Sequence, residues 1–374
     1  MTGMKLHTHD QMLFALLRMS LQGGEVETEF FRQSSADDWK ECYLLASRQG
    51  VMALAWDGVL RLPTELMPPK ALKITWGMAV EAYEKQYERY CSTIDDLSAR
   101  YASRGIRTVQ LKGVGLSAYY PIPSHREGGD IDIYTYSADV GMMMDKEANT
   151  LADRLMEEQG IEVDMHSLKH SKFYYKGIPV ENHKAFLNVE KYRQAIEAER
   201  KLKRLLNPQD TVLMDGKYHC MTPSLEFNLL FVAFHAAQHY GAGLALHHLC
   251  DWAVLLNRWA QPLPPTCLLD DRSFNQAVAA LSCLCNRYLG ASIPLDEEPD
   301  WVDEMLESIL YPKFVIGYVP VKGKLNILSY KLRRFMYIHR LNNQVLDWPM
   351  WKHVWESVVN YLREPETIFH TKVK

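Results

Sequence analysis

The sequence predicts an α+β fold, in which a small mixed-sheet domain is flanked by N-terminal helices and a C-terminal helical domain. Alternation of apolar and polar residues, the period of a strand, is confined to about residues 106–190. Apolar residues at helical spacing fill the segments before and after it. We therefore divide the 374 residues into an N-terminal helical region (1–104), an α+β domain (105–207) and a C-terminal helical domain (208–374).

Helix boundary signals support the N-terminal region. Ser35, followed by acidic residues, is a typical helix start, and Gly50 is a typical stop. A longer run, WGMAVEAYEKQYERYCSTIDDLSARYASRG, repeats apolar and aromatic residues at intervals of three and four and ends at Gly105. Tyrosine-rich amphipathic helices of this kind form packing surfaces more often than ligand sites, so we expect a packing role.

The α+β domain contains four strand candidates, the runs IRTVQL, GGDIDIYTY and the two arms of HSKFYYKGIPVENH. Lys176-Gly177 is the expected turn between these two arms. Ser137 offers an N-cap for a helix that reaches Gly160. From the break near residue 207 we expect helices to the end of the chain, with Thr222-Pro223 as a helix entry.

Composition and charge argue against a nucleic-acid-binding, a secreted or a membrane protein. Hydrophobic residues make up 47% and charged residues 24% of the chain, values that are usual for a globular protein. The net charge of −4 gives no support to a nucleic-acid partner, and the basic runs ERKLKRLL and SYKLRRFMYIHR fit solvated faces of amphipathic helices. There is no secretion signal and no apolar stretch of about 20 residues, so we expect a cytoplasmic protein with no membrane partner.

The seven cysteines contain no Cys-x-x-Cys pair, so neither a disulfide framework nor a cysteine zinc site is indicated. We expect buried free thiols.

Two aspartates, Asp130 and Asp132, stand one residue apart in a run that otherwise resembles a buried strand. On a strand they share one face, roughly 7 Å apart, while Ile131 and Ile133 point to the core. Two carboxylates in a sheet are costly unless a cation meets them, and hard oxygen ligands suit Mg²⁺ or Mn²⁺. The alternative is a solvated edge strand, and the spacing alone does not decide between the two.

The neighbouring motifs favour the metal. Lys112-Gly113 lie after a strand and before a short helix, an arrangement that can hold phosphate. Glu181 and His183 share one face of the last strand candidate. A third carboxylate beside the first two would complete a cluster for metal binding and base catalysis.

A zinc site is a separate alternative. His235 and His239 are four residues apart on one helical face, and His247, His248 and Asp251 follow. The run HAAQH lacks the glutamate of a zinc protease motif, and the glycines after it break the helix, so no common face is assured. We favour a packing role, with His248 and Asp251 at the border of the cleft.

These motifs together resemble the DNA polymerase beta-like nucleotidyltransferase superfamily and, within it, an uncharacterised bacterial nucleotidyltransferase family. The family pattern LKG…YP.P..R..GDIDI is matched over residues 111–133, H…G..VE.H over 170–183, and HL.D over 248–251. The resemblance spans about residues 105–256, and the flanking helices fit only in general character.

One feature departs from the superfamily, which has Gly-Ser or Gly-Gly directly after the first strand. Here Gly113 is followed by Val114, and Gly115 and Ser117 come afterwards. The resemblance therefore leaves open which of Gly113, Gly115 and Ser117 meets a triphosphate.

The resemblance implies transfer of a nucleoside monophosphate from an NTP to a hydroxyl acceptor, a small molecule or a protein, with release of pyrophosphate. It implies that Asp130, Asp132 and Glu181 are the catalytic residues and hold Mg²⁺ or Mn²⁺. The residues expected to bind nucleotide or acceptor are Lys112, Gly113, Gly115, Ser117, Arg126, His183, His248 and Asp251. The alternative function is a catalytically silent binding or scaffold protein that retains the fold.

Overall fold

The structure is a computed structural model that describes residues 4–137, 145–214, 216–314, 319–363 and 368–369. The N-terminal helices are α1 (Thr8–Gln22), α2 (Ala36–Arg48), α3 (Met52–Arg61) and α4 (Lys70–Ala102). The main sheet consists of β1 (Ile106–Gln110), β2 (Ile131–Ser137), β3 (His170–Tyr175) and β4 (Ile178–His183). Its connections contain α5 (Val114–Ser117) and α6 (Asp145–Glu157).

The remainder of the chain is mainly helical. It contains α7 (Arg193–Leu205), a hairpin of β5 (Gln209–Leu213) and β6 (Tyr218–Thr222), and then α8 (Leu225–Gly243), α9 (Leu246–Trp259), α10 (Arg272–Tyr288), α11 (Val302–Leu310), α12 (Lys324–Val345) and α13 (Met350–Arg363). The predicted α+β fold class is confirmed. Within the described residues no helix has the length and apolar character needed to cross a bilayer.

The main sheet is mixed, with the strand order β1-β2-β4-β3. β1 pairs antiparallel with β2, β2 pairs parallel with β4, and β4 pairs antiparallel with β3. The turn between β3 and β4 is the predicted one, since Lys176 and Gly177 both have a positive φ, as a tight hairpin turn requires.

The two faces of the sheet are covered by different helices. One face, which includes Ile131, Ile133 and Val180, packs against α4 and α6. On the other face Tyr134 contacts Phe186, which in turn contacts Phe227 of α8. Because side chains alternate along a strand, Asp132 lies on the same face as Tyr134, toward α8. The carboxylates are therefore between the sheet and the C-terminal helices.

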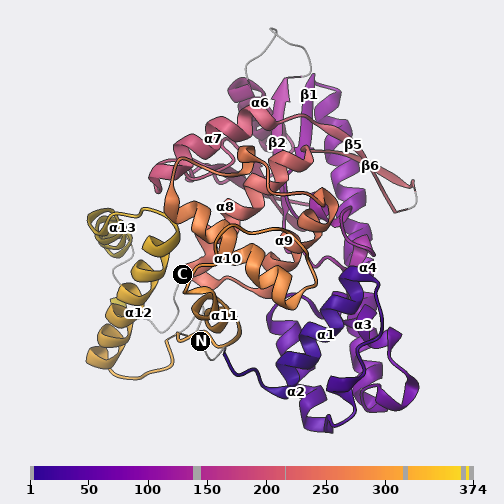
Figure 1. The fold of residues 1–374 in the computed structure, drawn as a ribbon. Helices are drawn as coiled ribbons and strands as arrows, with labels where there is room; N and C mark the ends of the chain where they lie inside the picture. Colours follow the sequence, from indigo (N-terminus) through magenta and orange to yellow (C-terminus); the bar gives the residue numbers. More distant parts are fainter. Residues whose placement is uncertain (1–3, 138–144, 215, 315–318, 364–367, 370–374) are drawn as a thin grey trace.

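One hydrophobic core joins residues from all three predicted regions, including Leu13 of α1, Val109 of β1 and Leu249 of α9. Figure 1 shows the sheet at the top, α1 to α3 at the bottom, and α8, α9 and α10 between them, with α12 and α13 at the left edge. α4 runs along one side from the N-terminal helices to the sheet. The boundaries at 104 and 207 stay predictions. All seven cysteines are buried and free.

Ser137 is the last residue of β2, and the predicted helix start directly after it lies outside the described residues; the described part of that helix runs from Asp145 to Glu157. One local expectation was wrong. The segment after residue 207 is not wholly helical, because β5 and β6 form an antiparallel hairpin. This hairpin lies beside β1 and α4, where the buried Leu213 and Cys220 join the core under the sheet.

Close packing of α1 on α3 depends on a glycine. A Cβ atom at Gly58 would lie 2.4 Å from the carbonyl oxygen of Leu16. We expect Gly58→Ala to lower the free energy of unfolding by about 1–3 kcal/mol, because α1 and α3 must move apart. Gly24→Ala is the matched control, since a Cβ there meets nothing within 4 Å. Urea unfolding measures both, and equal stabilities of the two variants would refute the packing argument.

Candidate active site

Three carboxylates converge at one edge of the sheet. Asp132 and Glu181 are paired residues on the neighbouring parallel strands β2 and β4. Asp130 lies directly before β2, two residues from Asp132, and so shares its face. One oxygen from each of the three side chains lies within 4.8 Å of the others. The structure thus brings together the three residues that the sequence predicts as metal ligands.

A lysine balances part of this negative charge. The Nζ atom of Lys112, from the turn after β1, lies 3.0 Å from Oδ1 of Asp132. Burial alone would raise the pKa of Asp132, but Lys112 and the hydrogen bond with His183 hold it well below its usual range. Burial and the neighbouring Asp132 raise the pKa of Asp130 to about 6. Asp132 is therefore firmly ionised, whereas Asp130 takes up a proton more readily than a free aspartate.

Histidines and a second lysine flank Glu181. Its carboxylate lies 2.6 Å from Nζ of Lys172 and 3.2 Å from Nδ1 of His170. His183 is fully buried, and its Nε2 lies 2.9 Å from Oδ1 of Asp132. The sequence analysis missed the roles of His170 and Lys172. Their alternation along β3, opposite His183 and Glu181 on β4, is the signal that could have found them.

The turn after β1 follows the carboxylates closely. Gly113 has φ 55° and ψ −119°, and a Cβ there would lie 3.3 Å from the carbonyl oxygen of Asp130. Gly115 is required for packing, since a Cβ would lie 2.5 Å from the carbonyl oxygen of Gln110. Of Gly113, Gly115 and Ser117, the three candidates for a triphosphate contact, only Gly113 therefore lies against one of the three predicted metal ligands, Asp130.

The Ser117 hydroxyl is engaged in contacts within the protein. Its side chain is fully buried, and its hydroxyl donates to the carbonyl oxygen of Val114 at 2.6 Å and lies 2.9 Å from the Tyr87 hydroxyl. The predicted contact of Ser117 with a triphosphate stays a prediction, and it would require these contacts to open.

Arg126 forms a buried ion pair. Its Nε and Nη2 atoms donate to the two oxygens of Asp251 at 3.1 and 2.9 Å, and the Tyr120 hydroxyl donates to Asp251 at 2.7 Å. This pair joins the loop before β2 to α9. The family motifs around Arg126 and Asp251 are thus brought together, 125 residues apart in the sequence. The predicted contact of Arg126 and Asp251 with nucleotide or acceptor stays a prediction.

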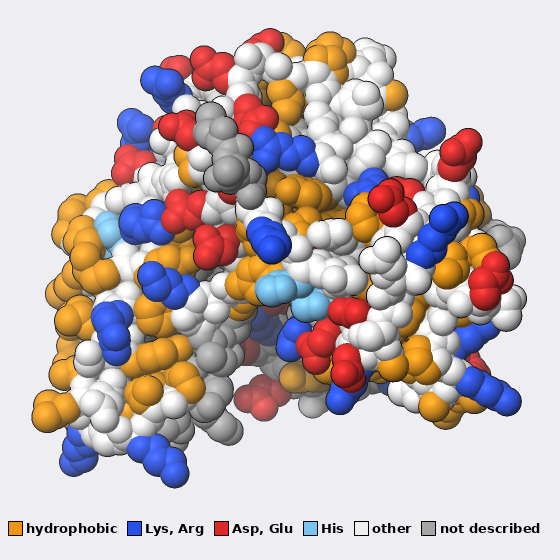
Figure 2. Space-filling view, turned by 60° about the horizontal axis from the view of Figure 1, so that its bottom comes forward, with side chains coloured by type: hydrophobic (Ala, Val, Ile, Leu, Met, Phe, Trp, Pro, Cys, Tyr) orange, Lys and Arg blue, Asp and Glu red, His pale blue; other side chains and the backbone are white. Residues whose placement is uncertain are grey.

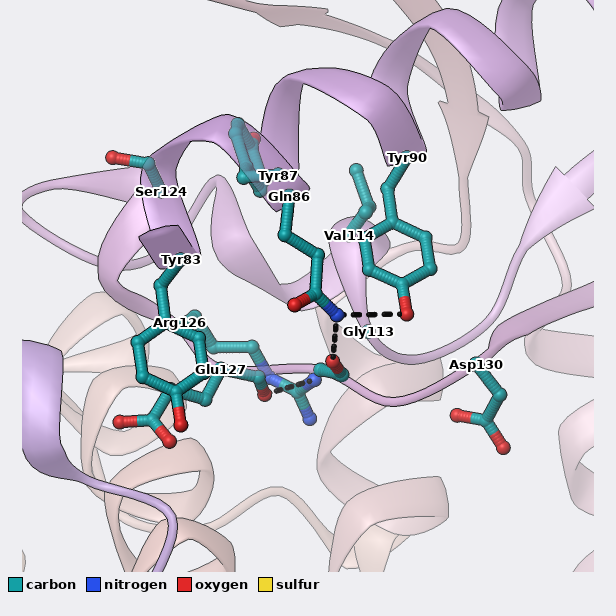
Figure 3. Close-up of a pocket in the computed structure, with 11 residues that line it drawn as sticks. Tyr83, Gln86, Tyr87, Tyr90, Gly113, Val114, Ser124, Arg126, Glu127 and Asp130 are labelled. Atoms are coloured by element: carbon teal, nitrogen blue, oxygen red, sulfur yellow. Dashed lines mark hydrogen bonds between the residues drawn. The ribbon is translucent and has the colours of Figure 1, made fainter. Parts of the chain in front are cut away.

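A narrow crevice opens beside Asp130, between α4 and the loop that precedes β2. It encloses about 330 Å³, part of it open to solvent, and is lined by Tyr83, Gln86, Gly113, Gly128 and other residues. Figure 3 shows Gln86 donating to the Tyr90 hydroxyl and to the carbonyl oxygen of Gly128, with Asp130 at the opposite side from Tyr83. The crevice gives Asp130, the one carboxylate of the three that lines it, access to solvent on the α4 side.

On the α8 side the structure gathers three histidines. His235 and His239 of α8 meet His248 of α9, with ring centroids 4.5 Å apart for the first pair and 4.8 Å for His239 and His248. α8 ends at Gly243, as the glycines predict, but the next helix folds back and restores a common surface. The expectation that no common face is assured was therefore wrong for these three residues.

The carboxylate cluster fits a divalent cation. The Oδ2 atom of Asp132 is buried and has no hydrogen-bond partner among the described residues. Such an atom is costly unless something positive meets it. The three side chains supply oxygen ligands, the type preferred by Mg²⁺ and Mn²⁺.

The sequence matches the model of a known family, the uncharacterised nucleotidyltransferases, over residues 35–271. The chain belongs to this family. The matched segment covers the carboxylates, the Lys112 turn, the Arg126–Asp251 pair and the histidine cluster, so the family assignment and the site coincide.

Two further comparisons were made for this family member. A solved structure of an antigenic nucleotidyltransferase-like protein from Paracoccidioides brasiliensis is similar at 13% identity, over 55% of this chain and 93% of that chain, with a TM-score of 0.36. No curated protein matches the chain.

A histidine beside the site makes stability depend on pH. His125 lies between two carboxylates, with Nδ1 2.7 Å from Asp57 and Nε2 3.0 Å from Glu84. Burial lowers the pKa of His125, but the hydrogen bonds with Asp57 and Glu84 outweigh it and the pKa is raised above 6.5. The protonated ring thus stabilises the folded state fully below pH 6.5, and this contribution is lost as the pH rises through the raised pKa.

We expect His125→Gln to destabilise the protein more at low pH than at high pH. Urea unfolding of both proteins over a pH series measures the difference in free energy. A difference that is constant with pH, or that grows as the pH rises, would contradict the assignment of a raised pKa to His125.

Proposed function

We propose that this protein is a metal-dependent nucleotidyltransferase that moves a nucleoside monophosphate from an NTP to a hydroxyl acceptor. The observation that supports the proposal is the convergence of Asp130, Asp132 and Glu181, whose oxygens lie within 4.8 Å of one another. In the reaction a bond forms between the acceptor oxygen and the α-phosphorus, and the bond from that phosphorus to the pyrophosphate oxygen breaks. The hydroxyl proton leaves to a base or to water.

Each residue of the site has a distinct role in the proposed reaction. Asp130, Asp132 and Glu181 would hold Mg²⁺ or Mn²⁺, which when bound neutralises triphosphate charge and stabilises the attacking and leaving oxygens. Gly113 lets the backbone come close to a phosphate beside Asp130, because it has no side chain. Lys112 contributes a cation beside Asp132. His183 holds the orientation of the Asp132 carboxylate.

Labelling identifies both the activity and the acceptor. The chain is incubated with each α-labelled NTP, with Mg²⁺ or Mn²⁺, and with a cell extract, and the labelled species is isolated. We expect label in one class of hydroxyl compound, dependent on the metal ion. Absence of transfer to any component with any NTP would contradict the proposal.

A catalytically silent binding protein is the second candidate, and the buried hydroxyl of Ser117 favours it, because that side chain cannot reach a phosphate in this conformation. Calorimetry separates the two candidates. Nucleotide binding that requires a divalent ion favours the enzyme, and nucleotide binding that is indifferent to the ion favours the silent protein.

A further inference from the structure

The side of the carboxylate cluster that faces α8 contains a lysine without a counter-ion. Lys169 lies directly before β3, and its backbone carbonyl accepts hydrogen bonds from the amides of Lys184 at 2.7 Å and Ala185 at 3.1 Å. These bonds fix the backbone of Lys169 beside the end of β4. Within the part of the chain that the structure describes, the Lys169 ammonium makes no hydrogen bond or ion pair.

Both cations and carboxylates surround Lys169. Burial and the neighbouring Lys112 lower the pKa of Lys169 to about 8, although Asp132 and Glu181 act in the opposite direction. These carboxylates already have partners, since Asp132 is paired with Lys112 and Glu181 with Lys172. The nearby Glu199 carboxylate accepts hydrogen bonds from two backbone amides. The Lys169 ammonium is therefore left to pair with an anion from outside the protein.

Lys169 is near enough to the histidine cluster to act electrostatically on His235 and His239. Burial, with Lys112 and Lys169 among the further causes, lowers the pKa of His235 and also lowers that of His239, to about 4. The rings are therefore neutral at physiological pH, and each still offers one N–H donor. Figure 2 shows histidine side chains near lysine or arginine and acidic side chains around a hollow of this face.

The hydrogen bonds of His248 favour an anion over a metal ion at this cluster. The backbone amide of Ala245 donates to Nδ1 of His248 at 3.1 Å. The proton of the neutral ring is therefore on Nε2, which can donate but has no lone pair for a metal. Lys112 and Lys169 would also repel a dication. Although one nitrogen from each of the three histidines lies within 4.8 Å of the others, the zinc alternative is disfavoured.

We propose that Lys169 and the His235–His239–His248 cluster form a binding site for an anionic group of the acceptor, a phosphate or a carboxylate. The inference rests on the proposed function and narrows the acceptor to hydroxyl compounds that carry such a group. Gly113 and the crevice lie toward α4, whereas the histidines lie on α8 and α9, and Lys169 is near enough to His235 to act on it electrostatically. The nucleotide and the acceptor would thus approach the carboxylates from different sides.

The test uses inorganic phosphate as the probe. Phosphate is titrated into the full chain at constant ionic strength, and binding is followed by calorimetry and by the rise in unfolding temperature. We expect Lys169→Met to weaken phosphate binding about tenfold, the loss of a charged hydrogen bond of roughly 1.4 kcal/mol. Lys184→Met is the matched control, because Lys184 is exposed and close in sequence, and it should bind phosphate like the natural chain.

A second arm separates the acceptor's anion from the triphosphate. The titration is repeated with Mn²⁺ and a non-hydrolysable ATP analogue bound. If phosphate still binds, the result supports a separate binding site for the anionic group of the acceptor. If the analogue abolishes phosphate binding, the site belongs to the triphosphate and the inference is overturned. Equal phosphate affinity of Lys169→Met and the natural chain overturns it as well.

His239→Phe keeps an aromatic ring but removes the N–H donor, and it should also weaken phosphate binding. This second variant tests the inference independently if Lys169→Met fails to fold. If the ATP analogue fails to bind while phosphate binding still requires Lys169, the result supports the anion-binding site and contradicts the proposed nucleotidyl transfer.

Discussion

Asp132→Asn is expected to reduce the rate of nucleotidyl transfer by at least about a thousandfold, since a bound divalent ion stabilises transition-state charge by several kcal/mol. Asp132 is 1% exposed, and its Oδ2 atom has no hydrogen-bond partner among the described residues. The amide keeps the shape of the side chain but removes the charge that would hold the cation. The rate is measured with an α-labelled NTP and the acceptor found by labelling.

Two controls separate the loss of the Asp132 carboxylate from general effects of the substitution. Asp300→Asn removes an exposed carboxylate and should transfer label at the natural rate. Because Asp132→Asn also leaves Lys112 without its partner, its unfolding temperature is measured, and Glu181→Gln provides a second loss of metal ligand. A folded Asp132→Asn protein with a rate within tenfold of the natural one would refute the catalytic role.

Arg126→Met is expected to lower the free energy of unfolding by about 3–5 kcal/mol, the usual result of removing one partner of a buried ion pair. Asp251 would be left buried, with the Tyr120 hydroxyl as its remaining side-chain donor among the described residues. Since this pair links the loop before β2 to α9, we expect transfer to fall as well. Urea unfolding measures the stability.

A double-mutant cycle separates the Arg126–Asp251 pair from general disruption. Replacing both residues, Arg126→Met with Asp251→Leu, removes both charges and should cost less than the sum of the two single changes. Additive losses of stability would show that the two side chains do not interact energetically, contrary to their 2.9 Å contact.

Sequence periodicity predicted the main sheet because its strands alternate strongly. Ile131 and Ile133 face the core as expected, and Lys176-Gly177 forms the expected turn. The convergence of Asp130, Asp132 and Glu181 was expected from strand parity and from the family resemblance, and the parallel pairing of β2 with β4 produces it. The chemical roles of these residues stay predictions.

Other features depend on contacts that local patterns do not record. The partner of Arg126 lies 125 residues away, and the histidine cluster depends on how α9 folds back onto α8. The burial of Ser117 follows from the packing of α5 on α4, which the glycine and serine spacing does not indicate. Lys169 was overlooked because an isolated lysine before a strand has no distinctive pattern.

Binding of Mn²⁺ is the most direct measurement of the central claim, that three converging carboxylates bind a divalent ion that engages a triphosphate. Electron paramagnetic resonance reports free Mn²⁺ during titration, with and without a non-hydrolysable ATP analogue. The account predicts tighter Mn²⁺ binding when the analogue is present, and loss of this binding in Asp132→Asn. Equal Mn²⁺ binding by the natural chain and Asp132→Asn, with no effect of the analogue, would contradict it.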